Sequence, residues 1–594
     1  MASMSQLIAR PATFSLSSPR TRSGLRPRRA TVHRVPCASS RGEERSEPDA
    51  PKHDRRDVLL GLGALGASAT LMSARRAGAD PVATPDISTC GPADLPPGAN
   101  VVTCCPPPSA ALPVDFTPPD AASSPLRRRP AAHSVTADYV ARLNAGIAAM
   151  KALPAGDPRS FAAQASVHCA YCDGSYSPNG FPRVELQVHN SWLFFPFHRC
   201  YLYFFERILG SLIGDPSFAI PFWNWDAPDG MRMPAMYADQ SSQLFDPRRD
   251  GRHAPPKLID LDYNGSERRF TDNQQIDRNL RVMYRQMVSL SPTPSLFFGG
   301  AYRAGDDPNQ GPGPVENIPH GPVHIWCGDP SQPSREDMGN FYSAGSDPLF
   351  YAHHANIDRM WTVWKGLDDV RRRRTDLADP DWLDASFLFY DETPKLVRIR
   401  VRDVLDTGAL GYQYQDVPMP WRAARPTVTA AAATRRADSL LTPAAQAASA
   451  AKKARKFPVT LDEAMSVTVK RPVAARRSEA EKASEEEVLV VDGIEVDRDV
   501  AAKFDVFVNA EDHGAVGSGG RELAGSFVNV PHRHAHGHGR GKKGGGIKTT
   551  LRLALNEQLE DLEAEDDESV EVTLVPRQGR GKVKVGSVRI ELVR

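Results

Sequence analysis

The histidines that could carry out chemistry fall into two groups along the chain. The groups are His168, His189 and His198, then His320, His324 and His354. Neutral imidazole binds copper, zinc, iron and nickel. One histidine on an apolar helix is usually a core residue. Six histidines in two groups of three are poorly explained in this way. Each group has enough imidazoles to hold one metal ion.

The spacing within the groups predicts how they are presented. His320 and His324 are four residues apart, so on a helix they share one face. Pro322 lies between them, which requires the helix to be only just beginning. His189 and His198 are nine apart, about half a turn out of phase on an ideal helix. We therefore expect His189 in an irregular lead-in and His198 inside a helix.

Aromatic residues surround His198 and predict a dry shell, which controls solvent access to a metal. They are Trp192, Phe194, Phe195, Phe197, Tyr201, Tyr203, Phe204 and Phe205. A dizinc hydrolase is one alternative, but zinc hydrolases often include a carboxylate ligand. Metal analysis distinguishes a dizinc site from a site that holds another metal.

The pattern of the remaining chain predicts a mostly helical domain over 80–421, a linker over 422–457 and a small β-sandwich over 458–594. Helical spacing is found in 135–151, 192–213 and 347–365, while 386–421 is typical of strands. The linker has few large apolar residues. Period-two alternation follows in 466–469, 487–491, 504–508, 569–574 and 587–592.

Two predicted targeting signals precede these domains. Residues 1–41 are rich in Ser, Arg and Pro without Asp or Glu, which is typical of a chloroplast transit peptide. Residues 42–79 hold Arg55-Arg56, an apolar run and Ala77-Gly78-Ala79, the pattern of a twin-arginine signal. The run is too short to span a bilayer stably. We expect transfer by the twin-arginine import machinery to the thylakoid lumen, and a mature chain that begins near Asp80.

The net charge and the cysteine content indicate the kind of partner and the redox compartment of the protein. The 73 basic and 72 acidic residues give a net charge of +1, which argues against nucleic acid as a partner. Of the eight cysteines, five crowd between Cys90 and Cys172, which indicates cross-links formed in an oxidising compartment.

Longer motifs resemble those of plant polyphenol oxidases, a branch of the type-3 copper proteins that includes tyrosinases and haemocyanins. They are His168-Cys-Ala-Tyr-Cys172, the segments 188–199 and 347–361, His320-Gly-Pro-Val-His324, Tyr412-x-Tyr414 and Lys503-Phe-Asp-Val506. The resemblance covers nearly the whole chain. It implies a four-helix bundle around a dicopper site, followed by the β-sandwich as a shielding domain.

The resemblance also implies roles for single residues. His168, His189 and His198 would bind the first copper, and His320, His324 and His354 the second, with His354 favoured over its neighbour His353. Cys172 would be joined to His189 by a thioether bond. Disulfides would join Cys90 to Cys105 and Cys104 to Cys169.

The reaction implied is oxidation of o-diphenols to o-quinones, with O2 reduced to water and at most weak tyrosinase activity. Phenols and O2 are the expected partners, and removal of the C-terminal domain is expected to end latency. Two alternatives stay open. One is a specialised oxidase that acts on a single phenol, and the other is a haemocyanin-like O2 carrier without catalysis.

Three further residues and one tract have open assignments. Phe341 matches the family's aromatic gate over the first copper, or packs only structurally. Glu316 resembles the family's water-holding glutamate, or is a cap or surface acid. Gly321 stands where strong monophenolases often have Asn, which predicts a preference for o-diphenols. The tract His532–His538 is a solvated loop or a copper-loading site, and its Gly-rich flanks favour the loop.

Overall fold

The computed structural model describes residues 80–96, 99, 103–109, 111–120, 124–367, 374–427, 456–473, 475–532 and 546–594. These residues all lie within one compact unit, 76–594. The two predicted targeting segments, most of the predicted linker and all of the His532–His538 tract except His532 lie outside the described residues.

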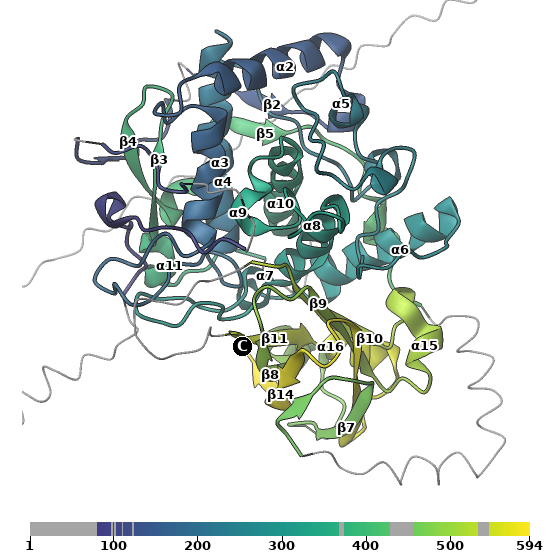
Figure 1. Ribbon diagram of the computed structural model, residues 1–594. Coiled ribbons are helices and arrows are strands. Elements are labelled where there is room, and N and C mark those ends of the chain that lie inside the picture. Colours follow the sequence, from purple (N-terminus) through teal and green to yellow (C-terminus); the bar gives the residue numbers. More distant parts are fainter. Residues whose placement is uncertain are drawn as a thin grey trace, which may run out of the picture. The chain divides into compact units, whose positions relative to one another are not determined.

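The first part of the described chain is mainly helical (Figure 1). Its helices are α2 (Ala137–Ala152), α3 (Phe161–Cys172), α4 (Phe194–Leu212), α5 (Ala235–Ala238), α6 (Asp272–Tyr284), α7 (Pro294–Phe298), α8 (Gly321–Cys327), α9 (Phe341–Ala344), α10 (Leu349–Lys365) and α11 (Pro380–Asp384). The helices predicted in 135–151, 192–213 and 347–365 are confirmed as α2, α4 and α10.

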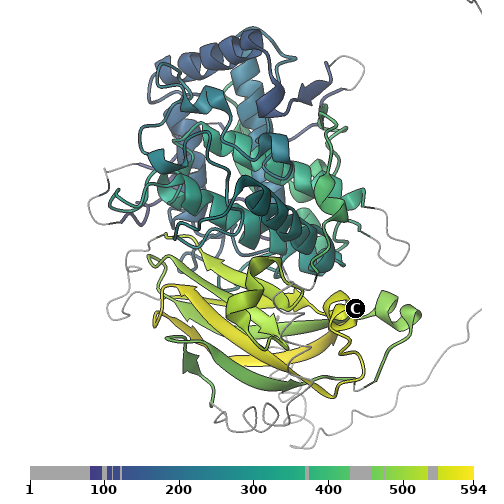
Figure 2. The ribbon, with the colours of Figure 1, turned by 90° about the vertical axis from the view of Figure 1, so that its right-hand side faces the viewer.

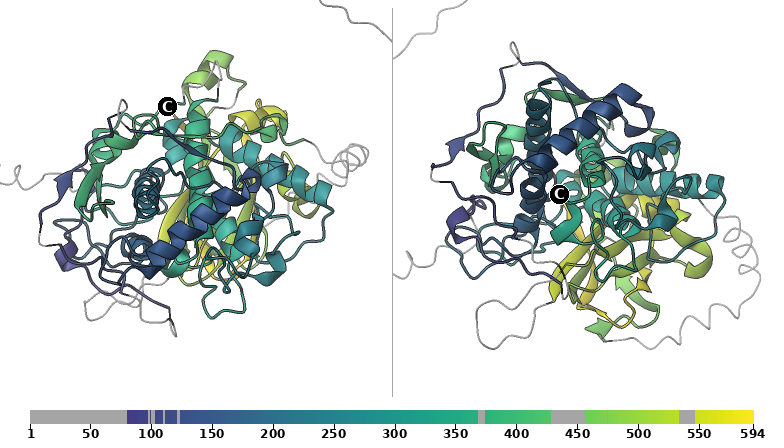
Figure 3. Two further views of the ribbon diagram at one scale, coloured as in Figure 1. Left: turned by 90° about the horizontal axis from the view of Figure 1, so that it is seen from above. Right: turned by 45° about the horizontal axis from the view of Figure 1, so that its top comes forward.

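Side-chain caps fix where several of these helices begin. The Thr136 side chain accepts a hydrogen bond from the Tyr139 N–H at the start of α2, and Ser160 does the same for Ala163 in α3. Helix α2 lies against α4, which Figure 3 shows from above. Gly146 makes this approach possible, because an added Cβ would lie 2.6 Å from the Leu209 side chain.

Helix α4 forms the centre of the helical core. Its residues from Phe194 to Gly210 are buried with the single exception of Arg207, so both faces of the helix contact other elements. Helix α10 packs beside it and is buried along most of its length. A helix that is apolar on all sides belongs in the interior of a large domain.

Short strands tie the helices together through buried ion pairs. Strand β2 (Arg127–Arg129) runs parallel to β5 (Tyr412–Tyr414). The hydroxyls of Tyr412 and Tyr414 both donate to the Asp358 carboxylate on α10, and Arg129 bridges Asp358 to Glu206 on α4. Residues two apart on a strand share a face, which explains the Tyr-x-Tyr spacing. A second small sheet has the order β1 (Val114–Asp115), β4 (Leu396–Arg400), β3 (Ser386–Tyr390).

The C-terminal part consists of two packed sheets, coloured light green to yellow in Figure 2. One sheet has the order β10 (Leu523–Asn529), β9 (Ala502–Val508), β12 (Ser569–Gln578), β7 (Met465–Lys470). The other has the order β11 (Ile547–Ala554), β8 (Glu486–Val496), β13 (Val583–Val585), β6 (Val459–Thr460), and β14 (Ser587–Val593) also pairs with β8. Short helices α14 (Glu479–Ser484), α15 (His513–Val516) and α16 (Asn556–Asp561) connect the strands.

Apolar side chains between these sheets form a core separate from that of the helical domain. The five strands predicted from alternation are confirmed as β7, β8, β9, β12 and β14. The predicted fold class, a helical domain followed by a small β-sandwich, is therefore confirmed.

Specific contacts join the sandwich to the helical domain. Lys503 on β9 forms a buried ion pair with Asp262 at 2.5 Å, and Arg498 pairs with Glu185 at 2.7 Å. Arg425, from the part of the predicted linker that is described, pairs with Asp561 at 2.9 Å. A buried pair loses far more when one partner is removed than an exposed pair does.

Two disulfides stabilise the segment before α2. They join Cys90 to Cys105 and Cys104 to Cys169, the same pairs that the family resemblance implies. Within the described residues, every helix is too short or too polar to cross a membrane.

Candidate metal centre

Four helices and two irregular segments present the six candidate ligands. His168 lies on α3, His198 on α4, His324 on α8 and His354 on α10. His189 precedes α4 in a segment without regular structure, as its spacing from His198 predicts.

His320 is the N-cap of α8, and Pro322 occupies the first turn of that helix. The pair His320 and His324 therefore stands at a helix start, which confirms the prediction drawn from Pro322. The preceding turn, Glu316–His320, is irregular, with extended backbone at Ile318 (φ −141°, ψ 127°).

The two histidine groups converge in the structure. The ligand nitrogens of His168, His189 and His198 lie within 4.8 Å of one another. A second cluster, within the same distance limit, contains four residues: His320, His324, His353 and His354. All of these side chains are buried, so a metal ion held here would be surrounded by imidazole and aromatic rings.

Hydrogen bonds fix the orientation of five of the six rings. Each Nδ1 faces an oxygen acceptor, so it carries the proton and leaves the Nε2 lone pair for a metal. The acceptors are Phe341 O for His168 (2.8 Å), Gln187 Oε1 for His189 (3.1 Å), Phe194 O for His198 (2.8 Å), Glu316 O for His320 (3.0 Å) and Met338 O for His324 (2.7 Å).

The opposite nitrogens are arranged for metal binding. The Nε2 atoms of His168, His189, His198 and His320 are buried and have no hydrogen-bond partner among the described residues. The Nε2 atoms of His324 and His354 lie 3.3 Å apart. Buried polar nitrogens without partners are costly unless something else satisfies them. The residues therefore fit two metal ions bound by imidazole.

Electrostatics favour the neutral rings that a metal requires. Burial lowers the pKa of His168 to about 3 and that of His324 to about 4, well below the ordinary value for histidine. Burial also lowers the pKa of the other four rings, and neighbouring imidazoles lower it further. Lowered pKa values favour the neutral imidazole, which keeps one ring proton and offers its other nitrogen to a metal.

His353 differs from its neighbour His354. The indole N–H of Trp225 approaches His353 Nδ1 at 3.2 Å. An indole only donates, so this Nδ1 must be the acceptor and the ring proton resides on Nε2. A nitrogen that carries its proton is a poor ligand. This physical argument supports the choice of His354 that the family resemblance implies.

Gln187 is a functional side chain that the sequence analysis missed. Its Nε2 donates to the Cys172 backbone oxygen, and its Oε1 accepts from both the backbone N–H and the ring of His189. It therefore positions the one first-group ligand that no helix holds. The Cys172 thiol itself is free and buried. A glutamine two residues before a loop histidine carries no sequence signal by which it could have been found.

The three other candidate residues line one cavity, together with His189 of the first group and His320 of the second. The Phe341 ring stacks on His189 with centroids 4.2 Å apart. Glu316 is buried rather than a surface acid, and burial raises its pKa well above the ordinary value although backbone N–H groups of Asn190, Gly313 and Ser191 oppose the rise. Gly321 lines the same cavity as Glu316 and Phe341.

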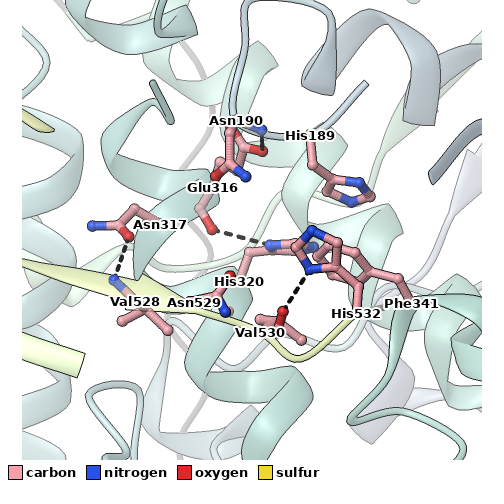
Figure 4. A pocket seen from close by; sticks show the side chains of 11 residues that line it. His189, Asn190, Glu316, Asn317, His320, Phe341, Val528, Asn529, Val530 and His532 are labelled. Carbon is pink, nitrogen blue, oxygen red and sulfur yellow. Dashed lines mark hydrogen bonds between the residues drawn. The ribbon is translucent and has the colours of Figure 1, made fainter. Parts of the chain in front are cut away.

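The C-terminal domain forms one wall of this cavity (Figure 4). Val528, Val530 and His532 line it opposite His189 and His320. The His532 ring stacks on Phe341 with centroids 5.0 Å apart and is only 1% exposed. For His532 the solvated loop favoured by the sequence is therefore wrong, because β10 carries this residue into the cavity ahead of the Gly-rich run.

Comparison with known proteins agrees with this geometry. Family models match residues 158–367 as "Common central domain of tyrosinase", residues 376–427 as "Polyphenol oxidase middle domain" and residues 457–592 as "Chloroplastic Polyphenol Oxidase C-terminal domain". The "Polyphenol oxidase, chloroplastic" of Malus domestica is 52% identical over 95% of this chain and 93% of its own. The larreatricin hydroxylase of Larrea tridentata is 45% identical over 100% of this chain and 99% of its own.

Solved structures show the same likeness. Latent apple tyrosinase is 53% identical, with a TM-score of 0.75 over 81% of this chain and 100% of its own. Latent aurone synthase is 43% identical, with a TM-score of 0.77 over 86% of this chain and 99% of its own. Active aurone synthase is 46% identical, with a TM-score of 0.55 over 57% of this chain and 100% of its own.

The helical fold around two converging imidazole clusters defines a type-3 copper oxidoreductase. The chain belongs to the plant polyphenol oxidase family. The cofactor of this family is a pair of copper ions per chain, and the two histidine clusters fit it.

Proposed function

We propose that this chain is a catechol oxidase that converts o-diphenols to o-quinones and reduces O2 to water. The observation that carries the proposal is the convergence of buried, metal-ready Nε2 atoms from both histidine groups beneath Phe341. Copper, when bound, supplies reversible one-electron chemistry toward O2. His168, His189 and His198 would hold one ion, and His320, His324 and His354 would hold the other.

The protein's own residues position the reaction and keep water out. The Nδ1 hydrogen bonds hold the rings in place, and a thioether between Cys172 and His189 would fix the loop ligand further. Phe341 stacks on His189 and would act as a gate, so an entering phenol would have to pass this ring. The buried position of the cavity makes each polar contact in it stronger than in water.

The preference for o-diphenols has a physical basis in two residues. A monophenol must lose a proton before it is hydroxylated, which requires a base near the site. Burial raises the pKa of Glu316, so this carboxyl tends to keep its proton and is less available to accept one, and Gly321 has no side chain to orient a water beside it. These features support catechol oxidation with at most weak monophenolase activity.

The uncleaved chain is, in this proposal, a latent form. Val528, Val530 and His532 fill the approach to the histidines. The solved latent form of aurone synthase aligns with 86% of this chain, whereas the active form aligns with 57% and is therefore shorter. A tethered domain covers a site effectively because its local concentration reaches about millimolar. Cleavage within 428–455 would release the cover.

A specialised phenol oxidase is the second candidate. It is favoured by the names of two relatives, "Aureusidin synthase" of Antirrhinum majus, 47% identical over 86% of this chain and 89% of its own, and the larreatricin hydroxylase. A haemocyanin-like carrier would bind O2 without turning over catechol. A phenol panel separates all three.

The route to the site of action is part of the proposal. The relatives from Malus domestica, Prunus armeniaca and Vitis vinifera are named chloroplastic. Together with the Arg55-Arg56 motif, this supports a transit peptide over 1–41, a twin-arginine signal over 42–79 and delivery to the thylakoid lumen. Catalytic, linker and shielding segments would then span 80–421, 422–457 and 458–594.

The test is O2 uptake on a panel of catechols and monophenols, with copper content measured on the same samples before and after cleavage within 428–455. The proposal predicts two coppers per chain, catechol turnover that rises on cleavage and slow monophenol turnover. A cleaved, copper-loaded enzyme that leaves every catechol unoxidised contradicts it.

A further inference from the structure

A polar side chain at the rim of the cavity is engaged by the shielding domain in an unusual way. Asn317 directly follows Glu316 and is 7% exposed. Its side-chain amide donates to the Ser526 backbone oxygen and accepts from the Val528 backbone N–H at 2.9 Å. Adjacent strands in a sheet make the same pair of backbone hydrogen bonds, one donated and one accepted.

Strand β10 needs such a partner because it lies at the edge of its sheet. Its other side pairs with β9, so the outward backbone groups of Ser526 and Val528 would otherwise face the helical domain unpaired. Asn317 therefore takes the place of a neighbouring strand. This accounts for the contact in the uncleaved chain, but it leaves open what the amide does once the domain is gone.

The segment 526–532 runs along the cavity from Asn317 at one end to His189 and Phe341 at the other. At one end a flat ring, His532, stacks on Phe341 beside His189. In the middle, Val528 and Val530 pass over Gly321 at contact distance from where a Cβ would stand. At the other end a peptide unit meets Asn317 (Figure 4). Val528 and His532 are four residues apart, so this path is at most about 13 Å long.

We propose that Asn317 recognises the polar tail of the phenolic substrate, and that in the uncleaved chain the backbone of β10 occupies this subsite. This inference rests on the proposed catechol oxidase function. After cleavage removes the shielding domain, the side-chain NH2 group of Asn317 is free to donate and its carbonyl oxygen is free to accept hydrogen bonds at the mouth of the cavity. These groups fit an o-diphenol whose side chain carries a carbonyl oxygen and an N–H, as in an amide-linked hydroxycinnamoyl compound. A catechol without such a tail makes no use of them.

The test compares two substrates in the cleaved enzyme. A protease recognition sequence placed within 428–455 lets the copper-loaded full chain be purified, cut and separated from its C-terminal part. The solved Grenache polyphenol oxidase, 52% identical, aligns over 99% of its chain with only 57% of this one, so a chain of the shorter length folds in a relative. The substrates are 4-methylcatechol and the N-methylamide of 3,4-dihydroxycinnamic acid.

In Asn317→Leu we expect kcat/KM for the amide to fall about tenfold, mainly through KM, because one or two hydrogen bonds to a neutral group are lost. Turnover of 4-methylcatechol should stay within about twofold of the unchanged enzyme. The matched control is Glu185→Gln, which removes the interdomain pair with Arg498 outside the cavity and should leave the ratio of the two substrates unaltered.

An equal fall for both substrates, or an unchanged ratio in Asn317→Leu, overturns the subsite and leaves Asn317 as a contact for the shielding domain alone. Failure of the unsubstituted cleaved enzyme to oxidise even 4-methylcatechol is a different result. It overturns the proposed function, and the subsite with it.

Discussion

The Nε2 atoms of His324 and His354 lie 3.3 Å apart in the buried core of the helical domain. His324 donates its Nδ1 proton to Met338, so its Nε2 presents a lone pair toward His354. Burial lowers the pKa of both rings, which disfavours a shared proton between them. A metal ion is the cation that satisfies this arrangement.

Replacement of His324 by alanine is expected to remove the second copper and retain the first. The purified variant should hold one copper per chain by metal analysis and take up no O2 with catechol. The control is Trp225→Phe, which removes the hydrogen bond to His353 without touching a proposed ligand and should keep two coppers. Two coppers and full activity in His324→Ala would disprove the ligand assignment.

Gly321→Asn should raise the ratio of monophenolase to diphenolase activity in the cleaved enzyme, because the amide can orient a water beside Glu316. The uncleaved chain is the wrong sample for this measurement. An added Cβ at Gly321 would lie 3.2 Å from the Val528 side chain and 3.4 Å from that of Val530, so the variant should also loosen the shield. Unsubstituted enzyme that oxidises both substrate classes at similar rates would refute the role of Gly321.

His532→Ala should raise the activity of the uncleaved chain. The stacked pair with Phe341 contributes about 0.5–1.5 kcal/mol beyond buried area, so its loss should raise the open population about two- to tenfold. His513→Ala is the matched control, because this ring lies against Phe507 within the sandwich. Catechol turnover before cleavage is the readout, and equal rates for the two variants would show that His532 does not contribute to the cover.

The shield should also weaken in acid. Burial alone would raise the pKa of Asp262, but the neighbouring Lys503 ammonium and Arg268 guanidinium lower it to about 2. A carboxyl whose pKa is lowered in the closed state stabilises that state above its ordinary pKa near 3.8, and the stabilisation is lost as pH falls toward 2.

The ratio of uncleaved to cleaved activity isolates this effect, since the copper site is common to both samples. It should rise as pH falls below about 4. In Asp262→Asn it should be high throughout and lose its pH dependence. A flat ratio in the unsubstituted chain would exclude the Lys503–Asp262 pair as a pH-sensitive contact.

Much of this architecture is predictable from the sequence because its signals are local. Pro322 between two histidines places them at a helix start, and alternation identifies β7, β8, β9, β12 and β14. Strand β10 escaped prediction because Leu523–Asn529 reads Leu-Ala-Gly-Ser-Phe-Val-Asn, in which apolar and polar residues do not alternate. Helix α6 escaped because its composition is largely polar.

The contacts that orient the site depend on distant segments. Gln187 reaches His189 across a loop, Trp225 meets His353 at a separation of 128 residues, and Asn317 meets Val528 at a separation of 211. No local pattern marks such pairs. His532 was assigned by its glycine-rich neighbourhood, whereas the strand that precedes it determines its position.

The most direct measurement is the stoichiometry of O2 uptake by the cleaved enzyme in a closed cell with limiting 4-methylcatechol, on samples of known copper content. Reduction of O2 to water takes four electrons and each catechol supplies two, so the account predicts one O2 consumed for every two catechols, with two coppers per chain. Hydrogen peroxide as product with one O2 per catechol, or the same turnover from a copper-free sample, would contradict it.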